Sequence, residues 1–379
     1  MLKKIIIFIS VFVIGLNVIL LLTDNLHLYK TIVYNYVDID DDDLFYHRVI
    51  EAKDPKAWPL SKDYNQIALD ESAMQELLDR KSVAFLVVKD DSLLFEKYWE
   101  SYGESSLSNS FSMAKSIISI LIGIAIDEGK IKSLDQKAGD FIEHFNNEKS
   151  NELTIRNLLM MSSGLSWDES YGSMFSLTTK AYYGSDLKKM VEDMEVVGSP
   201  GNSYKYLSGN SLVLGMILEN AVGKSVSEYA SEKLWTPINA EHNAEWSLDH
   251  ENGMEKAYCC FYSNARDFAR LGQLYLNDGK WNGKQIVSED YVKQSIVSAP
   301  IKDEHGKPNH KYGLHWWLMS RSGYDIFYAR GILGQYIAVI PDLNIVMVRL
   351  GHIRGEKLSD GHISDFVKYV DGVIASFGE

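Results

Sequence analysis

Ser112-Met113-Ala114-Lys115 stands at the head of a long apolar run that continues from residue 116 to residue 126. The run is too short for a good membrane span, and two acidic residues and Gly129 follow it. Glycine commonly follows the last turn of a helix, so the stretch predicts a buried helix. Residues three apart share one face of a helix, and we therefore expect Ser112 and Lys115 to be neighbours on the first turn.

This pairing suits nucleophilic catalysis. A serine hydroxyl is a poor nucleophile until a base takes its proton, and a lysine can be that base where its surroundings favour the neutral amine. The N-terminus of a helix adds free N–H groups and partial positive charge, which stabilise an oxyanion in acyl transfer. The alternative is a chance occurrence, because S-x-x-K is a short motif that needs structural context.

Composition restricts the class of protein. The chain has 379 residues and a formal net charge of -14, which argues against nucleic acid or an anionic membrane surface as a partner. Asp38, Asp40 and Asp42 match the start of a calcium loop, but Asp43 and Val49 occupy its glycine and distal glutamate positions. We interpret the acidic run as a solvated turn, and the sequence predicts no metal site.

The two cysteines, Cys259 and Cys260, are adjacent. Their number gives neither a disulfide framework nor a zinc spacing. Neighbouring cysteines rarely bridge each other, because the geometry is unfavourable. We expect both to be small buried apolar side chains without a redox role.

The first 23 residues form an anchor or a signal. An almost uninterrupted apolar stretch from Ile5 to Leu22 is just long enough to span a bilayer. No small-x-small cleavage site follows it, which favours an uncleaved anchor over a secretory signal that is removed. Lys3 and Lys4 would keep the N-terminus in the cytoplasm, so we expect a single-pass protein of the inner membrane. The rest of the chain would be periplasmic or extracellular, or secreted if the segment is cleaved.

Residues 24–80 are interpreted as a stalk and lead-in whose tail, residues 67–78, is a helix. Residues 81–379 are predicted to form one domain of α/β (α+β) class. The predicted strands span residues 83–88, 93–99, 314–319, 326–329, 336–340 and 345–350, and a helix closes the chain at 365–376. Two early strands and several late strands flank a helical region, which favours one antiparallel sheet built from both chain ends.

Several stretches occur in an order that resembles the serine β-lactamase and penicillin-binding-protein superfamily. They are Ser112-Met113-Ala114-Lys115, Thr154 to Leu165, Pro200-Gly201 followed by Tyr206-Leu207-Ser208-Gly209-Asn210, Ala265 to Gly272, and Gly331-Ile332-Leu333-Gly334-Gln335. The chain is most similar to the class C β-lactamase-like hydrolases, which include carboxylesterases and 6-aminohexanoate-oligomer hydrolases. The resemblance covers roughly residues 80 to 375 and implies a β-lactamase/transpeptidase-like fold with helices around the sheet.

The resemblance also implies roles. Ser112 would be the acylated nucleophile, Lys115 its base, and Tyr206 the relay that passes a proton to the leaving group. The N–H groups of Ser112 and Ile332 would form the oxyanion hole. Without the resemblance, Tyr206 would be interpreted as a loop aromatic packed on the core.

The chain departs from the family pattern at two places. Ala329-Arg330-Gly331 occupies the place of K-T-G, where Gly331 would let substrate approach the strand backbone. Arg330 either points at a substrate carboxylate or covers the surface. Ser208 occupies the asparagine position of Y-x-N, and Asn210 falls outside that spacing. Ser208, Asn210, Arg330 and Gly331 are the candidate substrate-binding residues. Both departures favour an esterase or amidase over an enzyme that recognises β-lactams.

Other polar residues are assigned structural roles. Trp167-Asp168-Glu169 is interpreted as a structural loop, because adjacent residues seldom face one site together. His315 is interpreted as a strand histidine, not as the base of a triad. No G-x-S-x-G elbow surrounds Ser163, which disfavours an α/β-hydrolase.

The sequence therefore predicts a membrane-anchored serine hydrolase that cleaves a small ester, amide or peptide through an acyl-enzyme and needs no cofactor. One alternative is β-lactamase or cell-wall D-alanyl peptidase activity. The other is a non-catalytic penicillin-binding-like scaffold, although a scaffold needs none of Ser112, Lys115 and Tyr206.

Overall fold

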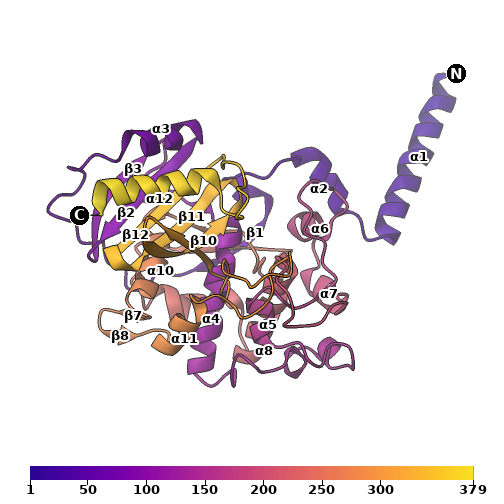
Figure 1. Cartoon of the computed structure of the whole chain (residues 1–379). Helices are drawn as coiled ribbons and strands as arrows, with labels where there is room; N and C mark the ends of the chain where they lie inside the picture. The colour runs from indigo at the N-terminus through magenta and orange to yellow at the C-terminus, as the bar shows by residue number, and fades with distance from the viewer. Residues whose placement is uncertain (379) are drawn as a thin grey trace.

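Strands from both ends of the chain form the main sheet (Figure 1). The computed structural model describes residues 1–378. All six strands are antiparallel, in the order β3-β2-β12-β11-β10-β9. Their bounds are β2 (Ser82–Lys89), β3 (Ser92–Tyr98), β9 (Trp317–Arg321), β10 (Tyr324–Gly331), β11 (Gln335–Ile340) and β12 (Ile345–Gly351). The pairing of β2 with β12 confirms the predicted sheet built from both chain ends.

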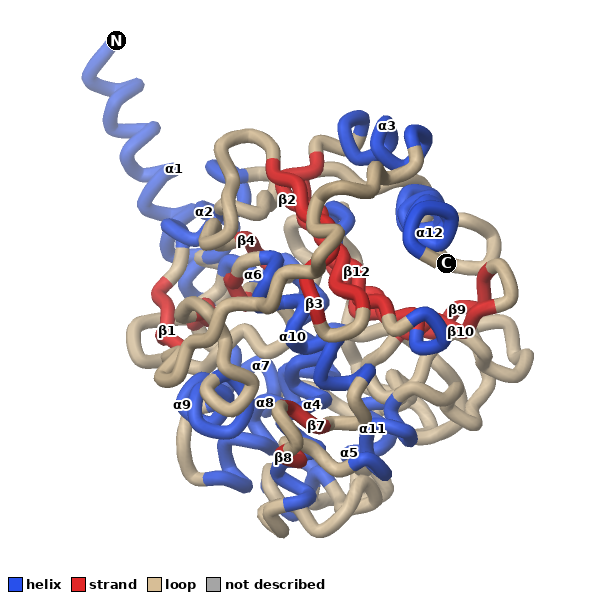
Figure 2. Tube along the Cα trace, turned by 90° about the vertical axis from the view of Figure 1, so that its left-hand side faces the viewer, coloured by secondary structure: helices blue, strands red, loops and turns tan. Residues whose placement is uncertain are grey.

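Helices cover both faces of this sheet, as Figure 2 shows. On one face, α12 (Ser364–Phe377) packs against α3 (Glu71–Asp79), and Phe366 stacks on Tyr328 of β10. On the other face lies α10 (Ala265–Leu276), which contacts β11 and β12. Side chains alternate between the faces of a strand, so each strand supplies apolar contacts to both helical layers.

The helical region lies between the early and late strands. Its helices are α4 (Ala114–Asp127), α5 (Ile155–Leu159), α6 (Leu177–Tyr183), α7 (Leu187–Glu192), α8 (Ser208–Val222), α9 (Val226–Ala230) and α11 (Glu289–Ser295). Helix α4 is buried along nearly all of its length and packs against α8. The apolar run after Lys115 is therefore a core helix, as predicted.

A second sheet departs from the expectation of one sheet. It has the order β1-β5-β6-β4, with β1 (Tyr46–Ile50), β4 (Ser108–Asn109), β5 (Ala244–Leu248) and β6 (Phe261–Ser263). A separate hairpin joins β7 (Lys280–Trp281) to β8 (Lys284–Gln285). These strands have two to five residues each, which is too short for a clear alternating pattern in the sequence.

The N-terminal segment reaches the body through two helices. Helix α1 (Leu2–Leu22) is long and apolar enough to span a membrane, and none of its residues is buried. Helix α2 (His27–Tyr34) packs against α6, and an ion pair of 2.6 Å joins Asp24 to Lys180. The segment predicted as a stalk and lead-in thus contributes α2, β1 and α3 to the packed structure.

The contact between α10 and the sheet depends on Gly272. A Cβ atom at this residue would lie 2.6 Å from Cγ1 of Val346 and 3.0 Å from Cγ2 of Ile337. The helix backbone therefore packs directly on the strands.

We expect Gly272→Ala to lower the free energy of unfolding by about 1–3 kcal/mol, because the added methyl group overpacks this contact. The measurement is urea unfolding of the full chain in detergent. Gly103→Ala is the matched control, because nothing lies within 4 Å of a Cβ atom at Gly103. Equal stability of the two variants would contradict the expected tight packing.

Candidate active site

Ser112 lies in a single 3-10 turn, Phe111–Met113, between β4 and α4. Phe111 has a φ of 43°, a conformation that is uncommon for a large side chain, and its N–H donates to Oδ1 of Asn109 at 2.8 Å. Both neighbours of Ser112 in the turn are buried, whereas Ser112 itself is partly exposed. The turn therefore presents the hydroxyl to a cavity.

Lys115 lies beside this hydroxyl, as the i, i+3 spacing predicts. Its Nζ atom is 3.0 Å from Oγ of Ser112 and donates to the backbone oxygen of Tyr258 at 2.8 Å. Burial lowers the pKa of Lys115 to about 8, against a smaller opposing effect from the negative charge of Glu169. A substantial fraction of this amine is therefore neutral near physiological pH.

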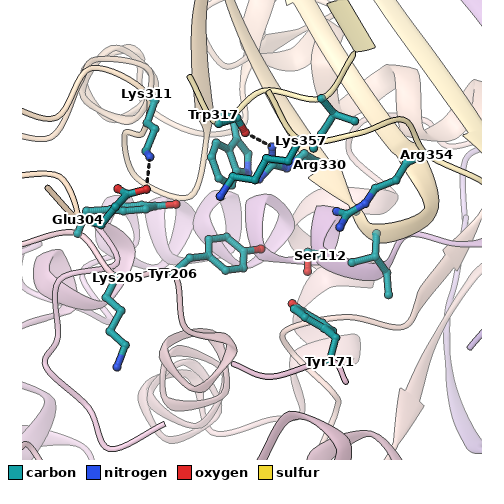
Figure 3. Close-up of a pocket in the computed structure, with 15 residues that line it drawn as sticks. Ser112, Tyr171, Lys205, Tyr206, Glu304, Lys311, Trp317, Arg330, Arg354 and Lys357 are labelled. Carbon is teal, nitrogen blue, oxygen red and sulfur yellow. Dashed lines mark hydrogen bonds and ion pairs between the residues drawn. The ribbon is translucent and has the colours of Figure 1, made fainter. Parts of the chain in front are cut away.

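Tyr206 completes the cluster from the segment before α8. Its hydroxyl points toward Ser112 in Figure 3, and the proximity of Ser112 partly opposes the effect of burial on the pKa of Tyr206. Burial raises the pKa of Tyr206 above its ordinary value, so the phenol is protonated. Nζ of Lys115 lies 5.2 Å from the centre of its ring. The structure thus brings together the three residues predicted to be catalytic.

Strand β10 ends next to the Ser112 turn. A Cβ atom at Gly331 would lie 2.3 Å from the backbone oxygen of Ser110, so only glycine permits this approach. The next residue, Ile332, lines the same cavities as Ser112. The guanidinium of Arg349 donates to the backbone oxygens of Leu333 and Gly334, each at 2.8 Å, and so holds the turn that contains Ile332.

Ser208 and Asn210 were both predicted to bind substrate, and the structure places them differently. The hydroxyl of Ser208 donates to Glu169 at 2.7 Å, and Ser208 lines a cavity together with Ser112. Asn210 is completely buried, with its oxygen accepting from Ser163 at 2.5 Å and its amide donating to Sδ of Met161. Asn210 therefore connects two segments of the core and lines neither cavity that contains Ser112.

Glu169, which the sequence assigns to a structural loop, lies next to the site. Its carboxylate accepts from the backbone N–H and the hydroxyl of Ser208, at 2.5 and 2.7 Å, and from the hydroxyl of Tyr171 at 2.6 Å. It therefore caps the N-terminus of α8, where negative charge is favourable. Its charge also acts on Lys115, which places it at the edge of the site. The acidic residue of the loop was visible in the sequence, but its partner was not.

Arg330 both covers the surface and faces the cavity. Its guanidinium lies 3.6 Å from the centre of the Trp317 ring, and it donates to the backbone oxygen of Gly361 at 3.0 Å. It lines a cavity of about 290 Å³ together with Ser112, Tyr206 and Gly331. The surroundings of Arg330 thus support both interpretations, that it binds a substrate carboxylate and that it covers the surface.

His315 is a buried structural residue. Its Nδ1 donates to the backbone oxygen of Leu159, and its Nε2 accepts from the hydroxyl of Ser211, both at 2.9 Å. Burial, with a further effect from the charge of Lys115, lowers its pKa to about 3. The neutral ring has both nitrogens occupied, so His315 has no free nitrogen to act as a base in this arrangement.

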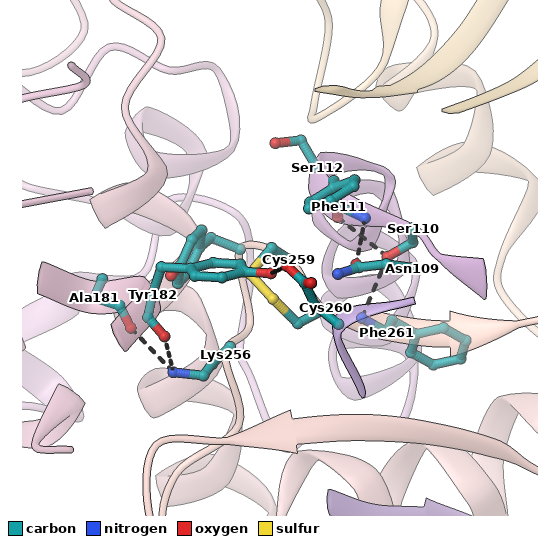
Figure 4. The surroundings of a disulfide bond; sticks show 12 residues. Asn109, Ser110, Phe111, Ser112, Ala181, Tyr182, Lys256, Cys259, Cys260 and Phe261 are labelled. Carbon is teal, nitrogen blue, oxygen red and sulfur yellow. Dashed lines mark hydrogen bonds between the residues drawn. A yellow bond between two sulfur atoms is a disulfide. The ribbon is translucent and has the colours of Figure 1, made fainter. Parts of the chain in front are cut away.

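Cys259 and Cys260 correct a prediction. Both are buried, as expected, but they are joined in a disulfide (Figure 4). Cys260 has a φ of 61°, so the chain turns here and does not continue as extended backbone, which would place neighbouring side chains on opposite faces. The disulfide directly follows Tyr258, whose backbone oxygen holds Lys115.

Within residues 1–378, no group of three or more histidine, cysteine, aspartate or glutamate side chains is arranged to hold a metal ion. The polar groups that line the cavity at Ser112 are mainly hydroxyls, amines and guanidinium groups, with one carboxylate, that of Glu304. Such groups can activate a nucleophile, stabilise an oxyanion and bind an anion.

Known proteins share this fold and this arrangement of the chain. A 6-aminohexanoate-dimer hydrolase of Paenarthrobacter ureafaciens is 24% identical over 324 residues, which cover 79% of this chain and 81% of the relative. The structure named "Putative 6-aminohexanoate-dimer hydrolase from Bacillus anthracis" has a TM-score of 0.75 at 22% identity and covers 89% of this chain and 92% of that chain. A family VIII carboxylesterase has a TM-score of 0.66 at 16% identity and covers 84% and 98%.

These likenesses confirm the β-lactamase/transpeptidase-like fold that the sequence predicted. The sequence match that defines the family is longer than half of the chain and extends from α3 to the segment before α12. It includes the Ser112 turn, the helical region and all six strands of the main sheet. Because residues 71–362 match the family described as Beta-lactamase, the chain belongs to this family of β-lactamase-fold hydrolases.

Proposed function

We propose that this protein is a serine hydrolase that cleaves an ester or amide bond through an acyl-enzyme on Ser112. The observation that carries the proposal is the cluster of Ser112, Lys115 and Tyr206, with Nζ of Lys115 3.0 Å from the nucleophilic oxygen. The low pKa of the buried lysine supports its role as a base.

The proposed reaction has two stages. Neutral Lys115 accepts the proton of Ser112 while Oγ attacks the acyl carbon, and the N–H groups of Ser112 and Ile332 stabilise the oxyanion. Tyr206 passes a proton to the leaving alcohol or amine as its bond to the acyl carbon breaks. A water molecule then attacks the acyl-enzyme, which releases the acid and restores Ser112.

Esters and linear amides are the proposed substrates. The place of K-T-G holds Ala329-Arg330-Gly331, and the guanidinium of Arg330 is packed on Trp317. A relative named for hydrolysis of 6-aminohexanoate dimers and a fold neighbour named as a carboxylesterase support the same two bond types. Turnover of nitrocefin would instead favour the β-lactamase alternative.

The proposed location is the outer side of the cytoplasmic membrane. No residue of the apolar helix α1 is buried, and Lys3 and Lys4 precede most of it. The body would then be attached to the membrane through α1.

We expect a fluorophosphonate probe to label the full chain at Ser112. The same chain should hydrolyse 4-nitrophenyl acetate or a short linear amide, and Ser112→Ala should lower turnover by at least about a thousandfold. Mass spectrometry of the labelled peptide identifies the residue. Absence of label in a protein with native circular dichroism would favour the scaffold alternative.

Activity should rise with pH because the active form of Lys115 is neutral. The pKa of about 8 predicts that kcat/KM for 4-nitrophenyl acetate increases from pH 6 and levels off above pH 9. Lys115→Arg should lose most activity at every pH, since guanidinium stays protonated. Rates of Ser112→Ala give the background to subtract. A profile that is flat across this range would argue against Lys115 as the base.

Alkaline phosphatase fused after residue 24 should be active, because it forms its disulfides only outside the cytoplasm. Enzyme assays on intact cells measure this directly. The variant with Lys3→Gln and Lys4→Gln should lower the signal, since it removes the positive charges that orient the helix. An inactive wild-type fusion would reverse the proposed orientation.

A further inference from the structure

We propose that the substrate is an anionic amphiphile whose acyl chain occupies an apolar cavity between α2 and the site, and whose anionic part occupies a separate cationic cavity. Ser112 lies where these two cavities meet. This proposal rests on the proposed serine hydrolase activity and specifies the chemical class of its substrate.

The first cavity is strongly cationic. Its lining includes Lys205, Lys311, Arg330, Arg354 and Lys357 and a single carboxylate, Glu304, which is paired with Lys311 at 2.7 Å. Within residues 1–378, the side chains of Arg354 and Lys357 have no hydrogen bond or ion pair. In a chain of net charge -14, this concentration of unpaired positive charge fits an anionic group such as a carboxylate or phosphate.

The two guanidinium groups act on the chemistry as well. Figure 3 shows Arg330 above the ring of Tyr206, with Arg354 on the other side of Ser112 from the Tyr206 hydroxyl. Burial raises the pKa of Tyr206, and the charges of both arginines oppose this effect. An anion bound here would therefore lie next to the residue that protonates the leaving group.

The second cavity has a volume of about 690 Å³ and a mainly apolar wall. Its lining includes Ile32 from α2, Tyr36 and Val37 after α2, Met174 before α6, Tyr182 of α6, and Cys259. Helix α2 is joined to the segment before α6 on this wall, because Nε2 of His27 lies 3.2 Å from the backbone oxygen of Met174. The volume lies in the range of small-molecule sites, and an acyl chain fits the chemistry of the wall.

The orientation of the substrate follows from Tyr206. This residue lines only the cationic cavity, whereas Ser112 and Ile332 line both. The leaving group departs toward its proton donor, so the anionic part leaves and the acyl part stays bound to Ser112. The acyl C–O or C–N bond breaks, the leaving atom takes a proton, and water then replaces Ser112 on the acyl carbon to give a carboxylic acid.

The position of α2 explains how an acyl chain would arrive. Helix α2 follows the membrane-spanning candidate α1 after a short turn (Figure 1). Large apolar side chains in and near the cavity wall are exposed, with fractions of 66% for Ile32, 73% for Val33, 83% for Tyr36 and 69% for Phe175. Such a cluster favours contact with a lipid surface or with an acyl chain.

The test uses the full chain in nanodiscs. We expect kcat/KM for 4-nitrophenyl octanoate to exceed that for the acetate by about tenfold or more, because the longer chain buries more apolar surface. Phosphatidylglycerol nanodiscs and soluble esters distinguish the two sources of the acyl chain. Fatty acid released from the nanodisc identifies a bilayer lipid, whereas turnover of soluble octanoate alone identifies an acylated molecule that arrives from outside.

Gly172→Phe tests the apolar cavity. Gly172 lines this cavity, and nothing lies within 4 Å of a Cβ atom there, so an added side chain enters open space. We expect the ratio of octanoate to acetate turnover to fall about tenfold. Gly103→Phe is the matched control, because it is also unobstructed and lines neither cavity; its ratio should equal that of the wild type.

Arg354→Gln tests the cationic cavity. Two octanoate esters are compared, one of 4-nitrophenol and one of 3-carboxy-4-nitrophenol, whose leaving group is anionic. We expect the variant to lower the ratio of anionic to neutral ester turnover by about fivefold, and Lys284→Gln, a distant cation on β8, to leave it unchanged.

Three outcomes are distinct. Loss of both preferences in the two cavity variants, with both controls unaffected, supports the proposal. Labelling and turnover at Ser112 without a preference for chain length or charge would overturn it and leave the hydrolase intact. Absence of labelling at Ser112 would overturn the proposed function and this inference with it.

Discussion

The chemistry of this protein depends on one buried amine. Lys115 is surrounded by core residues, and in residues 1–378 its Nζ hydrogen bonds go only to neutral oxygens, those of Ser112 and Tyr258. A buried ammonium group lacks the water that would stabilise its charge, so the protonation equilibrium shifts toward the neutral amine. Two backbone positions with positive φ flank this arrangement: Phe111 precedes Ser112, and Cys260 follows Tyr258, whose oxygen accepts from Lys115.

The main sheet contributes by bringing β10 against the nucleophile. Gly331 permits the approach, and Arg349 holds the following turn by hydrogen bonds to two of its backbone oxygens. Arg349 is itself buried in β12, and its Nε donates to Ser82 at the start of β2. A substitution far from the cavity can therefore displace the N–H of Ile332, because the guanidinium connects the centre of the sheet to this turn.

Apolar runs and residue spacings in the sequence predicted the helices and strands that depend on neighbouring residues, but not the contacts between segments distant in the chain. Strands β2, β11 and β12 and helix α4 were visible because each is a nearly continuous apolar run, and the spacing of Ser112 and Lys115 was visible in the sequence itself. The partner of Glu169, the disulfide of Cys259 and Cys260 and the burial of Asn210 were not visible. Each depends on a segment distant in sequence or on one backbone torsion, and a single sequence shows neither. The short strands of the second sheet were not predicted either, because each has too few residues to show an alternating pattern in the sequence.

The pairing of β2 with β12 has a consequence for biosynthesis. Met347 lies opposite Val87, so the middle of the main sheet joins the first of its strands in chain order, β2, to the last, β12. A ribosome must therefore translate almost the entire chain before the sheet can close. Until then β2 and β3 are a hairpin with an open edge, and such an edge invites pairing with other chains. Folding dominated by such distant contacts is slow, and a chaperone that covers the β2 edge during this interval would protect the nascent protein from aggregation.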